Sequence, residues 1–285
     1  MGLGARVKIG WAVILVFYAW LSLAAAAQEV EIYTYDVLPP YAYRNDKNEL
    51  TGLYIELVRA AVSRMPDYSL KLIVLPWERA KHLAKTGEAF AILPPYFHAH
   101  DWLTEQSPKR PYIWPYSLPL YTQQDVVICN DTVKVKSVNG YPEDFAGLSF
   151  VMWRGDGRAG EQFNAMVKRN EITVNLVNSI EVAINLLVTA RHDCTVSAAL
   201  PFNWFFAKQS KSEGFKSLNV KHTLNYLSVV STNEAYLGYT DINAQKNYPY
   251  KKDFAIKFDI EIYRMKQSGE LAKMVERFVD KDMFK

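Results

Sequence analysis

The sequence predicts an α/β protein made of two lobes of similar size. Three observations carry this prediction: strand and helix patterns alternate over residues 29–93, the same alternation returns over residues 148–198, and apolar strands at 123–129 and 224–231 flank the second series. The chain of 285 residues, 49% of them hydrophobic, is long enough to bury two cores of this kind.

The first series begins with EVEIYTY, whose alternation of apolar and polar residues is typical of a half-buried strand. Leu53, Leu57 and Ala61 then recur at helical spacing, which places them on one face of a helix. The expected elements are, in order, strand 29–35, a helix from 53 to 65, strand 70–75, helix 77–87 and strand 90–93.

The second series follows residues 94–118, a segment with five prolines that interrupts the alternation. Its expected elements are strand 148–153, helix 159–169, strand 172–177, helix 179–190 and strand 194–198. The chain ends in helices, and Leu271 and Phe278 lie on the apolar stripe of the last one.

The first 27 residues have the pattern of a secretory signal peptide. Arg6 and Lys8 form a short positive region, an apolar run continues to Leu23, and Ala25 to Ala27 provide an A-x-A cleavage site. A retained membrane anchor is the alternative, although the apolar run is shorter than the roughly 20 residues that a spanning helix needs. The sequence therefore predicts an exported, periplasmic protein.

These patterns divide the chain into four parts. They are the signal peptide at 1–27, the first part of lobe 1 at 28–122, lobe 2 at 123–224, and the returning part of lobe 1 at 225–285. Because ligands of parallel α/β sheets bind beyond the carboxyl ends of the strands, the loops at those ends are where a site is expected.

Charge and cysteine content narrow the function. The net charge is +3 and no run of Lys or Arg occurs, so nucleic acid is not an expected partner. Cys129 and Cys194 are the two cysteines; in an exported protein they can form a disulfide, but each also lies in an apolar stretch that suits a buried free thiol. No metal or cofactor motif is present in the sequence, so neither is expected.

Six short motifs in order resemble the extracellular solute-binding protein family 3, the periplasmic receptors of amino-acid-type ABC transporters. The motifs are Pro40-Tyr41, LTGLY at 50–54, LPWERA at 75–80, GEAFAI at 87–92, SLPLY at 117–121 and MKQSGEL at 265–271. The resemblance covers the mature chain. It implies a type II periplasmic binding fold, with two hinge strands that cross between lobes and a ligand held between the closing lobes.

Several residues of lobe 1 are candidates for the site. Asp36 and Tyr41 follow the first strand, where a carboxylate could accept a ligand hydrogen bond and a proline-fixed ring could stack on a ligand; the alternatives are a turn cap and a ring that covers the core. Tyr96 follows the strand at 90–93, and Tyr121 stands at the hinge, so both are candidates for the rim.

The motif WERA opens a helix and offers two further candidates. Trp77 could form a wall of the cleft or pack as an ordinary core residue. Arg79 gains nothing from the helix dipole near a helix start, so a role in ligand or ion-pair binding is considered, whereas Glu78 is favourable there without any function.

The family resemblance adds Arg110. Family members hold the ligand's α-carboxylate with an arginine about seven residues before the S-x-P element, and Arg110 stands seven before Ser117. A guanidinium suits bidentate carboxylate binding. A solvated surface charge is the alternative.

Lobe 2 contributes Trp153 and Arg154 after a predicted strand, and Trp204 further along the chain as a possible wall. Asp156 stands where family members offer backbone N–H groups to an anion, and it would repel a carboxylate. The aspartate that usually holds an α-amino group has no counterpart at 197–199. An ordinary α-amino acid is therefore a doubtful ligand.

We expect a non-enzymatic periplasmic receptor, a monomer by default, that delivers a small polar or aromatic solute to an ABC-type membrane permease. An enzyme on the same scaffold, similar to the periplasmic dehydratases, would need a poised carboxylate, for which Glu78 and Asp36 are the candidates. The third alternative is a module that presents its ligand-bound state to a membrane signalling protein.

Overall fold

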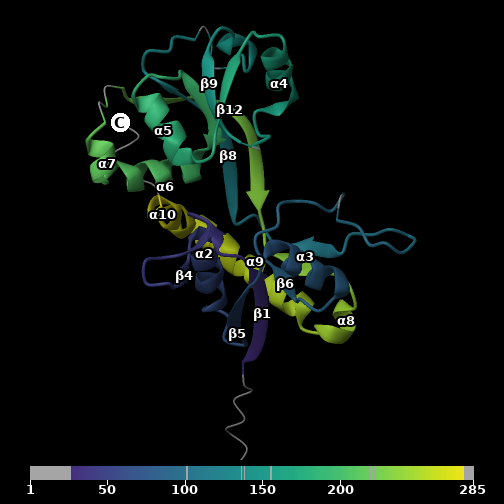
Figure 1. The fold of residues 1–285 in the computed structure, drawn as a ribbon. Helices are drawn as coiled ribbons and strands as arrows, with labels where there is room; N and C mark the ends of the chain where they lie inside the picture. Colours follow the sequence, from purple (N-terminus) through teal and green to yellow (C-terminus); the bar gives the residue numbers. More distant parts are fainter. Residues whose placement is uncertain are drawn as a thin grey trace, which may run out of the picture.

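The computed structural model describes residues 27–278 except residues 101, 136, 138, 155, 219 and 221. The predicted signal peptide therefore lies outside the described residues, apart from Ala27. The chain forms two bodies, each built on its own five-stranded sheet, and two long strands connect them (Figure 1).

The sheet of lobe 1 has the strand order β5-β1-β6-β13-β7. Its strands are β1 (Gln28–Thr34), β5 (Tyr68–Val74), β6 (Ala91–Ile92), β7 (Ile113–Tyr116) and β13 (Gly238–Thr240). β1 pairs in parallel with β5 and β6, whereas β13 is antiparallel to both of its neighbours. The chain thus returns from lobe 2 to complete the first sheet.

The sheet of lobe 2 has the order β10-β9-β11-β8-β12. Its strands are β8 (Tyr121–Asn130), β9 (Ser149–Trp153), β10 (Thr173–Val177), β11 (Cys194–Ala198) and β12 (Leu224–Ala235). β9 pairs in parallel with β10 and β11, and β8 is antiparallel to β11 and β12. In each sheet the first three strands of the order are parallel to one another, and the fourth is antiparallel to them. The two sheets therefore have equivalent arrangements. The expected α/β architecture with two lobes is confirmed.

The two lobes are joined by β8 and β12, which pair along their whole length from Tyr121–Ala235 at the lobe 1 end to Asn130–Leu224. Figure 1 shows both strands running from one body into the other. Of the two alternatives for the cysteines, the structure has the disulfide: Cys129 of β8 faces Cys194 of β11 across the sheet, with Cα atoms 4.0 Å apart.

Helices cover the sheets, and the longer ones, such as α2, turn an apolar face toward the core. They are α2 (Leu53–Val62), α3 (Trp77–Thr86), α8 (Ala244–Asn247), α9 (Lys251–Gln267) and α10 (Glu270–Glu276) in lobe 1, and α4 (Gly160–Lys168), α5 (Ile180–Val188), α6 (Ala199–Ser210), α7 (Glu213–Lys216) and the 3-10 helix η1 (Glu143–Phe145) in lobe 2. The largest core lies in lobe 1, where Leu57 of α2 and Phe258 of α9 are fully buried.

The loop after β1 differs from the sequence prediction. A three-stranded sheet of β2 (Val37–Leu38), β3 (Ala42–Arg44) and β4 (Leu50–Thr51) occupies the loop after β1, where no strand was expected. Strands of two or three residues are too short to show a period in the sequence. Among the described residues, no helix is long and apolar enough to cross a membrane.

Candidate functional site

A cavity of about 530 Å³ lies between the two lobes, beside the strands that join them. Lobe 1 lines it with residues of the loop after β1 and with Tyr96, β8 and β12 line it with Gln123, Asp125 and Asn233, and lobe 2 provides the remainder. The lobe 2 lining is Trp153, Asp156, Arg158, Asn178, Ser179, Ile180, Glu181, Ala183, Thr195, Val196, Ser197, Ala198, Pro201, Phe202 and Phe205. The volume of the cavity is within the ordinary range for small-molecule sites.

The lobe 1 wall depends on how the chain turns back toward α2. Gly52 has a φ of 122°, and a Cβ at this position would lie 2.4 Å from the carbonyl oxygen of Tyr41. Only glycine fits such a close approach. The Tyr41 carbonyl also accepts a hydrogen bond from the backbone N–H of Tyr54 at 3.0 Å, so the start of α2 fixes the position of Tyr41.

Tyr41 lines the cavity from within the lobe 1 core. Its ring stacks on that of Tyr54, with centroids 4.6 Å apart, and tilts against Tyr121 at 5.9 Å. The side chain is 1% exposed, and its hydroxyl group has no hydrogen-bond partner among the described residues. Burial raises the pKa of Tyr41 well above its usual value, so this hydroxyl is a neutral donor.

A chain of hydrogen bonds connects lobe 1 to the joining strands. The Tyr96 hydroxyl donates to Oε1 of Gln123 at 3.1 Å, and Nε2 of Gln123 donates to Oδ1 of Asp125 at 3.2 Å. Asp125 also accepts from Oγ of Ser231 on β12 at 2.7 Å. The carboxylate is therefore held by groups from both strands that pass between the lobes.

Arg158 extends this chain into lobe 2. Its Nη1 donates to Asp125 at 2.8 Å, and its Nε donates to Asp156 at 2.6 Å. Burial lowers the pKa of Arg158, but the bonds and charges of Asp156 and Asp125 outweigh this effect and raise it overall. The guanidinium is thus a permanent cation whose charge is more than balanced by the buried carboxylate of Asp125 and the half-buried carboxylate of Asp156.

The start of α5 and the end of β9 form one part of the remaining lobe 2 wall, and β11 and α6 form the other. Oγ of Ser179 accepts a hydrogen bond from the backbone N–H of Val182 and caps α5. Glu181 lies in the first turn of this helix and lines the cavity. Trp153 at the end of β9 is 48% exposed, so a large aromatic surface is open to a ligand.

An aromatic contact joins the lobes outside the cavity. Tyr43 of β3 and Trp204 of α6 meet edge to face, with ring centroids 5.4 Å apart. Lys208 lies over the Trp204 ring, 5.2 Å from its centroid. Leu200 at the start of α6 is buried in the core of lobe 1. One helix of lobe 2 therefore contacts lobe 1 directly.

Comparisons with solved structures support this architecture. The L-cystine solute receptor of Neisseria gonorrhoeae, in its unliganded open conformation, superposes with a TM-score of 0.63 over 90% of this chain and 95% of its own, at 18% identity. The GlnP substrate binding domain 2 of Lactococcus lactis gives 0.64 over 89% and 96%, at 13% identity. The chain has the two-lobed type II periplasmic binding protein fold.

The same fold occurs in a histidine kinase sensor domain described as similar to periplasmic binding proteins, with a TM-score of 0.53 and 13% identity over 88% of this chain and 96% of the other. Neither a scan against family models nor a search of the curated proteins found a match. The structural neighbours therefore show the fold.

Three of the ten predicted site residues line the cavity, namely Tyr41, Tyr96 and Trp153. Tyr121 lies one layer behind, against Tyr41, and burial raises its pKa to about 12. Arg154 is exposed and donates to Oδ1 of Asn178 at 3.3 Å, at the edge of the lining. Their role in ligand binding stays a prediction.

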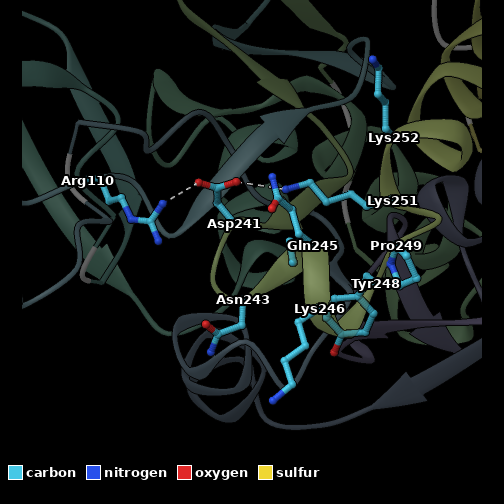
Figure 2. Close-up of a pocket in the computed structure, with 10 residues that line it drawn as sticks. Arg110, Asp241, Asn243, Gln245, Lys246, Tyr248, Pro249, Lys251 and Lys252 are labelled. Carbon is cyan, nitrogen blue, oxygen red and sulfur yellow. Dashed lines mark hydrogen bonds and ion pairs between the residues drawn. The ribbon is translucent and has the colours of Figure 1, made fainter.

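Arg110 does not belong to the described lining of this cavity. It lies in lobe 1 at a different pocket of about 670 Å³, where its guanidinium is 3.3 Å from the carboxylate of Asp241 and its side chain is 56% exposed. Figure 2 shows Arg110 and Lys251 approaching Asp241 from opposite sides. The prediction of an Arg110 clamp in the cleft is therefore not supported by its position.

Of the other predicted residues, three have partners elsewhere and one is exposed. Asp36 forms an ion pair with Arg44 at 2.6 Å, Trp77 packs on Tyr35 at 5.2 Å, and Arg79 is exposed on α3. Trp204 makes the contact with Tyr43 described above. Among the described residues, the cavity lining includes none of these four predicted side chains.

Sequence reasoning missed Asp125, Arg158 and Glu181. Asp125 gives a signal in the sequence, because a carboxylate precedes the apolar run VVIC of a buried strand and such a charge needs a partner. Arg158 follows Asp156 by two residues, and this short separation lets the two side chains form an ion pair within one loop. Asp156, considered as a group that repels carboxylates, is bound to this arginine.

Proposed function

We propose that this protein is a periplasmic receptor that captures a small polar or aromatic solute between its lobes and delivers it to an ABC-type permease. The observation that carries this proposal is the cavity lined by both lobes and by both joining strands. A ligand in such a position contacts both bodies at once, so its binding free energy favours the closed arrangement.

The likeness to the gonococcal L-cystine receptor and the lactococcal GlnP domain supports the proposal at the level of fold. Export through a cleaved signal peptide, a periplasmic location and a monomeric state belong to the same proposal, and the pattern of the first 27 residues supports the export.

An enzymatic role has less support. Glu78, one candidate acid or base, has a side chain 85% exposed and pairs with Lys81 at 2.6 Å on α3. Asp36, the other, pairs with Arg44. Asp125 and Asp156 do line the cavity, but both carboxylates are bound to Arg158, which favours a positioning role over proton transfer.

A sensory role is the second candidate, because a histidine kinase sensor domain shares the fold. Transport and sensing use the same ligand-bound lobes and differ in the membrane partner. Uptake of labelled solute by cells with and without the gene separates them: loss of uptake supports transport, whereas unchanged uptake with a lost transcriptional response supports sensing.

A thermal-shift screen across amino acids, amines and organic acids tests the receptor function. A solute at about 100 times its Kd stabilises the folded state by about 2.7 kcal/mol, which raises Tm by several degrees. Trp153→Ala should remove most of the shift, because this ring faces the cavity.

Trp114→Ala is the matched control, since Trp114 is 51% exposed, similar to Trp153, and lies outside the described cavity lining. It should keep the full shift. If no solute of any class changes the Tm of the intact protein, the receptor function is contradicted.

A further inference from the structure

The cavity between the lobes carries an excess of negative charge. Asp125, Asp156 and Glu181 line it, and Arg158 is the cationic side chain in the described part of its lining. Three carboxylates against one guanidinium leave two negative charges. Asp125 is 3% exposed as a residue, so these charges are in part removed from water, where Coulomb interactions are stronger.

Arg158 is not free to neutralise an anionic ligand. Its Nε and Nη1 groups already donate to Asp156 and Asp125 at 2.6 and 2.8 Å. The charge of the guanidinium is balanced before any ligand enters. A second cation nearby, Arg154, is exposed and is not among the described lining residues; it donates to Oδ1 of Asn178, which does line the cavity, at 3.3 Å. An incoming carboxylate therefore finds no uncompensated cation in the described cavity wall.

Glu181, unlike Arg158, is available to bind a ligand group of opposite charge. Its side chain lines the cavity, it is half-buried, and among the described residues its carboxylate has no hydrogen-bond or ion-pair partner. A partly desolvated carboxylate without a partner is a natural counter-ion for an ammonium or guanidinium group. The backbone carbonyl of Glu181 accepts a hydrogen bond from Nε2 of Gln209 at 3.2 Å, and this bond leaves the carboxylate unoccupied.

The uncharged part of the wall suits the apolar body of such a ligand. Trp153 offers an open ring face, Phe205 lies on the same lobe, and cations bind favourably over aromatic faces. Tyr41 lines the cavity from lobe 1, and its buried hydroxyl has no hydrogen-bond partner among the described residues.

We propose that the cavity takes an organic cation, an amine or guanidine with an apolar body and no carboxylate, and that Glu181 is its counter-ion. This inference rests on the proposed receptor function and specifies the ligand class. An α-amino acid would bring its carboxylate toward two uncompensated negative charges, and the guanidinium of the described lining is already bound. The site therefore favours cations without a carboxylate over ligands that carry one.

Pairs of probes that differ in one α-carboxylate test the inference. Agmatine and arginine, putrescine and ornithine, and phenethylamine and phenylalanine are each titrated calorimetrically, with 3-phenylpropionate as the anionic probe. We expect the amine of at least one pair to bind at least tenfold more tightly than its parent amino acid, and 3-phenylpropionate to give no binding.

Glu181→Gln should weaken binding of that amine at least tenfold while the unfolding midpoint stays near that of the wild type. Glu161→Gln is the matched control, because Glu161 lies in the first turn of α4 in the same lobe but is exposed and outside the described lining. It should leave the affinity unchanged.

The outcomes separate the two proposals. Tighter binding of an amino acid or of 3-phenylpropionate overturns the cation inference and leaves the receptor function intact. An affinity for the amine that Glu181→Gln does not change overturns the role of Glu181. Absence of binding by every probe of all three classes counts against both the inference and the receptor function.

Discussion

The two lobes share one strand order but differ in what holds them together. Lobe 1 has a large core rich in Tyr and Phe, completed by α9 after the chain returns, and a smaller cluster beside α3. Lobe 2 also has two clusters, on either side of its sheet, and adds the disulfide between β8 and β11. The same topology is therefore stabilised by burial alone in one lobe and by burial with a covalent link in the other.

The walls of the cavity differ in a related way. The lobe 1 side consists of apolar and tyrosine side chains, including Leu38, Pro39 and Tyr41, whereas Asp156, Arg158 and Glu181 all come from lobe 2. Lobe 1 thus provides an uncharged surface with two tyrosines, whereas lobe 2 with β8 provides the charges together with the rings of Trp153 and Phe205.

The largest effect is expected from removal of the disulfide, which is the covalent difference between the two lobes. Replacing Cys129 and Cys194 together by alanine removes a link that closes a loop of 65 residues, worth about 4 kcal/mol in chain-entropy terms. Lobe 2 should then unfold at a lower temperature than lobe 1, which scanning calorimetry would record as a separate transition. Wild-type protein in reductant is the control, and a single unshifted transition in both samples would contradict the prediction.

The second effect tests the buried charges of lobe 2. Asp125→Asn leaves Arg158 with one carboxylate instead of two, and breaking a buried pair in this way costs about 3 kcal/mol. Asp36→Asn is the control, because it breaks the more exposed Asp36–Arg44 pair of lobe 1 and should cost less than about 1 kcal/mol. Equal losses of unfolding free energy in denaturant titrations would contradict the prediction that the buried ion pair contributes more to stability than the exposed one.

A smaller effect is expected at the aromatic wall of lobe 1. Tyr41→Phe removes a buried hydroxyl without a partner, so the ligand-free protein should gain up to about 1 kcal/mol or stay unchanged. Tyr239→Phe removes a similar hydroxyl outside the described cavity lining and should do the same. Only Tyr41→Phe should weaken solute binding, by about two- to tenfold in calorimetric titrations. An equal loss in both variants would exclude a direct contact.

The smallest effect concerns the contact between the lobes. The Tyr43–Trp204 pair is worth about 0.5–1.5 kcal/mol. Trp204→Ala should therefore shift the ligand-free protein toward more separated lobes and raise its radius of gyration in solution scattering. Phe206→Ala on the same helix removes a ring that packs on Phe215 within lobe 2 and should leave the radius unchanged. No change in either variant would mean that the aromatic contact does not hold the lobes.

The fold could be predicted because many of its strands and helices have a recognisable pattern in their own stretch of sequence. Strands such as β1 and β5 and the apolar stripe of α2 have clear periods, and their order implies two parallel sheets. β2 was missed because two residues show no period. Helix α2 ends at Val62 rather than at Met65, and helix ends are the least certain part of such predictions.

The site was harder to predict, because its charges meet across long separations. Asp125 and Arg158 are 33 residues apart and belong to a strand and a loop whose proximity depends on the completed sheet. Arg110 was chosen from its spacing to Ser117, but the chain after β6 carries it to the lobe 1 surface beside Asp241. Tyr41 was accessible to prediction because a proline turn directly after the first strand has a fixed place in the fold.

The most direct test of a site shared by both lobes is the distance between them with and without solute. Spin labels at Ser63→Cys after α2 and Lys168→Cys at the end of α4 are both on exposed positions, one on each lobe. Pulsed dipolar spectroscopy with the solute that raises Tm most should give a distance distribution that moves and narrows. An unchanged distribution at saturating solute would contradict binding between the lobes.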